Sequence, residues 1–144
     1  MNPLTIPMPQ GSDPESVAHR AWAKLASGNM ESVADECSDD VVWHMMGLET
    51  LLPNGGRYVG NAAVREFMKM GPQLYVFSKM VVDISATYVC GETVIMEFSF
   101  DTPVTNGRHY KANYIIVMKI VDGKICDVHE YADSLKVKTC LIDP

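Results

Sequence analysis

A pair of long apolar segments in the last third of the sequence places the strongest constraint on the fold. The segments lie between Arg108 and Ser134, and the short turn Val121-Asp122-Gly123 joins them. An Asp-Gly turn between two segments of alternating character is typical of a β-hairpin. The alternation predicts which side chains share one face of the hairpin, namely Tyr110, Ala112, Tyr114, Ile116 and Met118 on the first strand and Cys126, Val128, Glu130 and Ala132 on the second.

Helical patterns precede the strands. Residues Ser12 and Glu15 have the spacing of a capping box and predict the start of a first helix, and Asn29 has the position of a cap for a second, short helix. A third helix is expected to begin at Asn61 and to end before Gly71. Helices followed by an antiparallel meander indicate an α+β fold with the helices on one face of a curved sheet.

The remaining segments are expected to be strands or irregular structure. The first strand is predicted at residues 41–46, and the segment 47–60 is expected to be mostly loop because it holds Pro53, Asn54, Gly55 and Gly56. Three prolines make residues 1–11 an irregular arm, so residues 12–144 are expected to form a single domain.

Composition excludes several classes of partner. The formal net charge is −6, and the 12 Lys and Arg residues are scattered, which disfavours binding to nucleic acid or to an anionic membrane. No apolar run reaches the roughly 18 residues of a membrane span, and the N-terminus is unlike a signal peptide. The widely spaced cysteines are expected to be buried thiols in a reducing, cytoplasmic compartment: Cys37, Cys90, Cys126 and Cys140.

Four short segments together resemble a known family. They are Asp39-Asp40-Val41-Val42-Trp43, residues 60–67, Asp122-Gly123-Lys124-Ile125 and Glu130-Tyr131-x-Asp133. In this order they resemble the SnoaL-like polyketide cyclases of the nuclear transport factor 2-like superfamily, which also holds ketosteroid isomerases and limonene epoxide hydrolases. The resemblance covers about residues 14–136 and implies a cone-shaped α+β barrel, three N-terminal helices on a strongly curved mixed or antiparallel sheet, a homodimer and a deep apolar pocket.

The functional residues of those relatives are mostly missing. The resemblance places the ketosteroid isomerase tyrosine, general base and oxyanion-hole acid on Ala21, Met45 and Ile116. Of the epoxide hydrolase carboxylates, the resemblance leaves Glu97 on the middle strand and Glu130 before Tyr131 as counterparts, and the middle strand has no arginine beside Glu97. The reaction of neither relative is therefore carried over intact.

Glu130 is the leading candidate for a catalytic group. Among apolar neighbours, a carboxyl at Glu130 would have a pKa raised toward neutrality and could both take and return a proton. The alternative is a partly solvated Glu130 at the strand end, paired with a lysine. His129 has the opposite parity and would face outward, unless a bulge turned it inward to act as a proton relay.

Other ionisable residues have weaker patterns. Glu97 falls on the polar face of its strand, although the epoxide hydrolase comparison turns it toward a cavity. Glu49 is expected either in a lid over the pocket or as an exposed loop charge, and His44 and His109 are expected to face solvent. The histidines show no metal-binding spacing, so no metal site is expected.

The predicted pocket is apolar and irregular. The ten methionines suit an adaptable wall, and the residues expected to line the pocket are Trp43, Met45, Phe67, Met68, Tyr114, Ile116 and Val128. Together these observations indicate a cofactor-independent isomerase, cyclase or dehydratase acting on a hydrophobic polyketide- or terpenoid-like molecule in a biosynthetic pathway. The alternatives are an epoxide hydrolase, in which Asn113 would have to face inward, a non-catalytic module that binds a lipophilic ligand, and a scaffold with a filled pocket.

Overall fold

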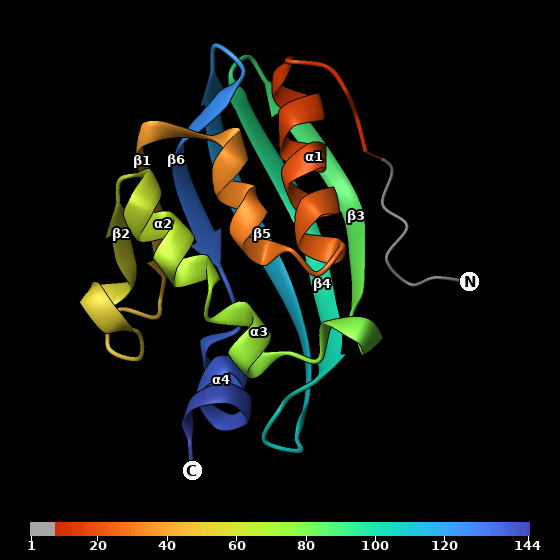
Figure 1. Ribbon diagram of the computed structural model, residues 1–144, viewed down its shortest axis with the longest axis vertical. Coiled ribbons are helices and arrows are strands. Elements are labelled where there is room, and N and C mark those ends of the chain that lie inside the picture. The colour runs from red at the N-terminus through yellow and green to blue at the C-terminus, as the bar shows by residue number, and fades with distance from the viewer. Residues whose placement is uncertain (1–7) are drawn as a thin grey trace.

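A single curved sheet of six strands forms the back of the molecule (Figure 1). The computed structural model describes residues 8–144, so most of the expected N-terminal arm lies outside the described residues, and residues 8–11 are irregular. The strand order is β2-β1-β6-β5-β4-β3. The bounds are β1 Cys37–Met46, β2 Arg57–Val59, β3 Val81–Cys90, β4 Thr93–Pro103, β5 His109–Val121 and β6 Lys124–Tyr131.

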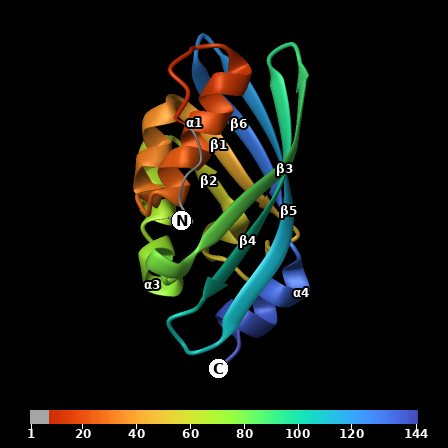
Figure 2. The same cartoon turned by 90° about the vertical axis from the view of Figure 1, so that its right-hand side faces the viewer.

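Helices cover one face of this sheet and leave the other largely open (Figure 2). The covering layer contains α1, the 3₁₀ segment η1, α2 and the one-turn α3, while the C-terminal α4 and η4 lie at the end of the sheet. The bounds are α1 Pro14–Ala26, η1 Met30–Glu36, η2 Pro53–Gly56, α2 Asn61–Met68, α3 Gly71–Leu74, η3 Phe77–Lys79, α4 Ser134–Val137 and η4 Lys138–Ile142. We call the covered face inner and the open face outer.

The predicted α+β class and mixed sheet are confirmed. Strand β1 runs parallel to β6, and all other neighbours in the sheet are antiparallel. The barrel is less complete than predicted, because the sheet of the described residues does not close: β2 and β3 are its two edges. The helix count also differs, since α3 and the C-terminal turns join the three predicted N-terminal helices.

Local caps explain where the helices begin. Asp13, and not Ser12, caps α1, because its carboxylate accepts a hydrogen bond from the Ser16 backbone N–H at 3.1 Å. Asn29 caps η1 as predicted. Gly60 is the cap of α2, and the Asn61 side chain instead donates to the Ala34 carbonyl at 2.8 Å, which ties α2 to the end of η1.

One predicted boundary was wrong, and two short elements were not predicted. The segment expected to be a loop contains β2, a three-residue strand that pairs with β1 at one edge of the sheet. The third predicted helix, α2, does end before Gly71. Gly71 and Pro72 then begin α3, which was not predicted, since proline is compatible with the first turn of a helix. The first strand also begins four residues earlier than predicted, at Cys37.

A bulge in β6 changes the predicted parity at Cys126. Lys119 pairs with Asp127 but Ile120 pairs with Ile125, so Cys126 has no partner across the ladder. Ile125 therefore takes the inner position, and Cys126 is only half-buried. Of the four cysteines expected to be buried, Cys37 alone is; Cys90 is exposed and Cys140 is half-buried.

No helix within residues 8–144 is long and apolar enough to cross a membrane.

A buried ion pair fixes α1 against the end of η1. Glu36 is buried and accepts hydrogen bonds from Arg20 at 2.8 Å and from Lys24 at 2.5 Å. Burial acts to raise the pKa of the Glu36 carboxyl, but the hydrogen bonds from Lys24 and Arg20 outweigh it and leave the pKa below its usual range. The two cations on α1 thus keep this carboxylate charged inside the helical layer.

Replacing Glu36 by alanine should destabilise the fold by about 2–4 kcal/mol, because the substitution leaves Arg20 and Lys24 partly buried without their partner. The change is measured as the free energy of unfolding in urea at neutral pH. Glu66→Ala is the control, since the Glu66–Lys69 pair is exposed and should contribute less than about 1 kcal/mol. Equal effects of the two substitutions would contradict this role of Glu36.

Candidate active site

Two adjoining hollows lie between the inner face of the sheet and the helices. The inner hollow has a volume of about 60 Å³ and reaches down to Glu130 on β6. The second hollow lies on the same inner face of the sheet but farther from Glu130, and we call it the outer hollow of the pocket. It has a volume of about 90 Å³ and opens between α3, the loop after β1 and the C-terminal turns. Both are lined by Met30, Met45, Phe67, Tyr75 and Tyr114. These shared walls make the two hollows one irregular, largely apolar pocket.

Glu130 is the buried carboxyl of this pocket. Its cross-strand neighbours are Met45 on β1 and Ile116 on β5, so the strands on both sides offer it apolar side chains. Glu130 is 7% exposed, and its Oε1 accepts one hydrogen bond, from the Trp43 indole N–H at 3.0 Å. Burial raises the pKa of Glu130 to about 7, against the smaller lowering effect of the Trp43 hydrogen bond.

Three tyrosines stand near this carboxyl. The hydroxyl groups of Tyr110 and Tyr114 are hydrogen-bonded to each other, and Tyr75 stacks on Tyr110 with ring centroids 6.0 Å apart. Burial raises the pKa of each of the three phenols above its ordinary value. The phenols therefore stay neutral at physiological pH and act as hydrogen-bond donors. Of the two hydroxyl protons in the Tyr110–Tyr114 pair, one is left to donate to a ligand.

The indole N–H of Trp22 is a hydrogen-bond donor without a partner in the described part of the protein. It lies on α1, lines the inner hollow and stacks nearly parallel to Trp43, with ring centroids 6.4 Å apart. Trp22 Nε1 is the one buried side-chain nitrogen or oxygen atom, among residues 8–144, that has no hydrogen-bond partner. A buried donor without a partner costs about 1–3 kcal/mol, so an oxygen atom of a ligand would be bound favourably there.

The wall of the outer hollow comes from segments far apart in the sequence. Leu48 and Leu52 follow β1, Leu74 lies on α3, and Val137 and Leu141 belong to the C-terminal turns. Glu49 lies in the same loop as Leu48 but is exposed, and its carboxylate accepts from the Gly47 backbone N–H. The apolar residues of this loop, and not its charge, therefore form the pocket wall.

Most of the residues predicted to line the pocket do so. The structure places five of the seven in the two hollows: Trp43, Met45, Phe67, Met68 and Tyr114. Ile116 and Val128 have inner-face positions as predicted, but both are fully buried in the core beneath and do not line the hollows. Trp22 and Tyr75 were not among the predicted pocket residues. Trp22 lies on the buried face of α1, a position typical of ordinary core packing.

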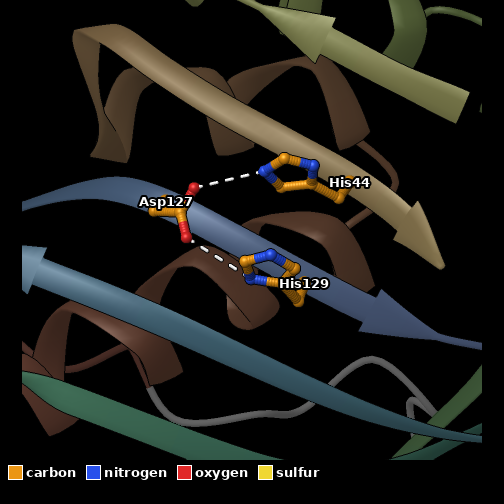
Figure 3. Close-up of side chains that lie close together, drawn as sticks. All are labelled: His44, Asp127 and His129. Atoms are coloured by element: carbon orange, nitrogen blue, oxygen red, sulfur yellow. Dashed lines mark hydrogen bonds and ion pairs between the residues drawn. The ribbon is translucent and has the colours of Figure 1, made fainter.

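His129 and Glu97 do not reach the pocket. His129 lies on the outer face, where its ring stacks on His44 beside Asp127 (Figure 3). The bulge in β6 occurs before His129 and leaves its outward direction unchanged. Glu97 also lies on the outer face and accepts a hydrogen bond from the exposed Tyr88 hydroxyl at 3.0 Å. Both residues have the outward direction that strand alternation predicts, and the alternative that turned them into the pocket as catalytic groups does not agree with the structure.

The remaining polar candidates also lie outside the pocket. Asn113 is exposed, because it alternates with the buried Ala112 and Tyr114 on β5. His109 is exposed as predicted, and its Nε2 lies 2.5 Å from Asp101 Oδ1. Glu130 is thus the one carboxyl that lines the two hollows.

This arrangement is suited to moving a proton within an apolar ligand. A carboxyl with a pKa of about 7 is populated in both protonation states at neutral pH, so it can act as a base and then as an acid. The neutral Trp22 and tyrosine donors can stabilise negative charge that develops on a ligand oxygen.

The sequence and the fold have known relatives. A family model described as a SnoaL-like domain matches residues 18–128. No curated protein sequence matches the chain. An NTF2-like protein of unknown function from Burkholderia pseudomallei is 14% identical, with a TM-score of 0.78 over 92% of this chain and 98% of the other.

Two further solved structures have ascribed activities. A protein from Bacillus subtilis to which an isomerase activity is ascribed is 24% identical, with a TM-score of 0.72 over 88% of this chain and 91% of its own. An LEH-like epoxide hydrolase from M. tuberculosis is 17% identical, with a TM-score of 0.67 over 87% of this chain and 86% of its own. At these identities the likeness establishes the fold alone.

The raised pKa of Glu130 should make stability depend on pH. The folded chain holds a proton on Glu130 up to about pH 7, whereas the unfolded chain releases it near the ordinary value of 4.5. The contribution of Glu130 to the free energy of unfolding is therefore fully present below pH 4.5 and is lost as the pH rises to 7. The total loss should be about 3 kcal/mol. Unfolding in urea, repeated from pH 4.5 to 7.5, measures it.

Glu130→Gln supplies the comparison, because the amide keeps the size of the side chain and does not titrate. The difference between the unfolding free energies of the two proteins should change by about 3 kcal/mol between pH 4.5 and pH 7.5. A difference that stays constant over the same range would contradict a raised pKa at Glu130.

Proposed function

Because the chain belongs to the SnoaL-like domain family, we propose that it is a cofactor-independent acid–base enzyme acting on a hydrophobic small molecule. The reaction class is proton abstraction next to a carbonyl, followed by isomerisation, cyclisation or dehydration. The observation that carries this proposal is the buried Glu130 carboxyl, with a pKa of about 7, which lines the inner hollow of the apolar pocket.

Glu130 is the proposed base and acid. As a carboxylate it accepts a proton from a carbon beside the carbonyl group, and as a carboxylic acid it returns that proton to another atom of the same molecule. The Trp43 hydrogen bond holds the carboxyl in one orientation and keeps part of it ionised at neutral pH. No redox step is involved, and the proton is balanced within one turnover.

The substrate oxygen is proposed to lie near Trp22 and the tyrosines. Abstraction of the proton moves negative charge onto the carbonyl oxygen, and the unpartnered Trp22 N–H lines the same hollow as Glu130. A hydroxyl proton from the Tyr110–Tyr114 pair is a second donor within the tyrosine cluster. Donors already in place need no reorganisation as the charge develops, which lowers the barrier.

The pocket favours a compact, apolar skeleton. Hollows of about 60 and 90 Å³ with shared walls suit a single small ring as they stand, since a cavity of about 150 Å³ accommodates benzene; a fused ring system requires the walls to move. Methionine side chains at Met30, Met45 and Met68 can rearrange around a larger or irregular ligand. We therefore propose a polyketide- or terpenoid-like substrate, consistent with a role in a biosynthetic pathway.

Other activities predict different outcomes in the same pocket. An epoxide hydrolase would need groups that activate water, and among the residues of the two hollows Glu130 is the one carboxyl to do so. Conversion of styrene oxide to its diol would favour that alternative. Saturable binding of a lipophilic ligand without turnover would favour a binding module.

The test uses 2-tetralone, a bicyclic ketone with acidic hydrogens beside its carbonyl. In D₂O at pH 7 the protein should accelerate the exchange of these hydrogens for deuterium, and Glu130→Gln should slow the catalysed exchange at least about 100-fold, because it removes the proton acceptor. The rate is followed by proton NMR.

Glu97→Gln is the matched control, since it makes the same change in a carboxylate on the outer face. It should leave the exchange rate unchanged. Exchange that survives in Glu130→Gln, or that is lost equally in both variants, would refute the role of Glu130. Binding of 2-tetralone without any acceleration would refute the proposed reaction class.

We further propose that the chain forms a homodimer through the outer face of the sheet. This face carries large exposed apolar side chains from several strands, namely Val59, Tyr88, Ile115 and Tyr131. Ile115 and Tyr131 are cross-strand neighbours and so form a continuous patch. Contiguous exposed apolar surface of this kind marks contact sites between proteins.

Sedimentation equilibrium tests the dimer. The protein at tens of micromolar should have twice the chain mass, and Ile115→Lys should shift it to the monomer, because the charge would be buried without a partner. A monomeric parent protein would contradict the proposal, as would an Ile115→Lys variant that stays dimeric.

A further inference from the structure

Three side chains with metal-binding atoms meet on the outer face of the sheet. His44 comes from β1, and Asp127 and His129 come from β6 (Figure 3). His44 Nε2 lies 3.3 Å from Asp127 Oδ1, and His129 Nδ1 lies 3.3 Å from Asp127 Oδ2. All three ligand atoms lie within 4.8 Å of one another, and all three residues are half-buried.

The sheet register holds this cluster in place. His44 and His129 are direct partners in the parallel β1–β6 ladder, so their side chains leave the sheet side by side. Their rings are parallel within 4° and have centroids 4.3 Å apart. Asp127 is two residues before His129 and therefore shares its face. The regular pairing of residues 42–46 with residues 127–131, after the bulge at Cys126, thus sets the face from which all three side chains project, without contribution from a loop.

We propose that His44, Asp127 and His129 bind one divalent transition-metal ion of the Zn²⁺ class. Zinc binds histidine nitrogen and carboxylate oxygen at about 2.0–2.2 Å, which sets tetrahedral ligand atoms about 3.4 Å apart. Each histidine nitrogen lies 3.3 Å from one of the two Asp127 oxygens, which is close to this spacing, and one ligand atom from each residue lies within 4.8 Å of the others. Imidazole ligands favour zinc and its neighbours over magnesium or calcium.

The arrangement of charge is compatible with a dication. Asp127 supplies one negative charge, and two neutral imidazoles would bind through nitrogen lone pairs. In the ladder Arg57 is the partner of His44 and Lys119 the partner of Asp127, but both cationic side chains are exposed and can extend into solvent. Their repulsion weakens the site without blocking it.

The site is separate from the pocket. His129 and Glu130 are adjacent in β6, but their side chains lie on opposite faces of the sheet. Three protein ligands leave the remaining coordination positions to water in the single chain or, where the outer face meets a second copy in the proposed dimer, to a donor atom of that copy. Metal binding here is thus independent of the proposed acid–base reaction.

Competition with a chromophoric zinc chelator at pH 7.5 tests the inference. The full chain should take up one Zn²⁺ ion, and His44→Ala, His129→Ala and Asp127→Asn should each weaken uptake at least about tenfold, because each removes one of three ligands. His109→Ala is the matched control: His109 is also an outer-face histidine beside an aspartate, Asp101, but it has no second histidine. This control should bind as the parent does.

Cobalt(II) in place of zinc reports the ligand type. A bound Co²⁺ ion should show visible absorption without a thiolate-to-metal charge-transfer band, since the proposed ligands are nitrogen and oxygen. Three outcomes would overturn the inference: no saturable uptake at one ion per chain, equal uptake by His44→Ala and His109→Ala, or a thiolate band that assigns the ion to the exposed Cys90 or another cysteine.

Discussion

The burial of one carboxyl against the inner face of the sheet is the constraint on which the account depends. Glu130 stands between Met45 and Ile116 in the ladder and receives a single hydrogen bond, from Trp43. A charged carboxylate in that position would lose most of its hydration for one compensating donor, and its pKa therefore rises. The surrounding fold leaves this group only 7% exposed, and the Trp43 hydrogen bond offsets part of the cost.

Strand alternation separates two different chemistries by one residue. Glu130 faces the apolar pocket, while its neighbour His129 faces outward beside His44 and Asp127. The inner group has little solvation and few partners, which suits proton transfer. The outer cluster has accessible nitrogen and oxygen atoms in fixed directions, which suits coordination. A one-residue slip of β6 would exchange the two faces, so the register with β1 and β5 sets both sites.

Sequence patterns predicted side-chain directions and helix starts correctly where these depend on neighbouring residues alone. Alternation along the last hairpin placed Glu130 inside and His129 outside, and Asn29 marked the start of η1.

The patterns failed at irregular features and at contacts between residues far apart in the sequence. The bulge at Cys126 breaks the alternation without a glycine to mark it, and β2 is too short to show a period. His44 and Asp127 lie 83 residues apart and meet only through the parallel pairing of β1 with β6. The free N–H of Trp22 becomes visible only when every neighbouring acceptor is placed.

The most direct test of the account is the ionisation of Glu130 itself, followed through the side-chain carboxyl carbon by carbon-13 NMR, with Glu130→Gln to assign the signal. The account predicts a midpoint of about 7 and, in Trp43→Phe, a higher midpoint, because the substitution removes the hydrogen bond that stabilises the charged form. A midpoint near the ordinary glutamate value of 4.5, unchanged by the loss of Trp43, would contradict it.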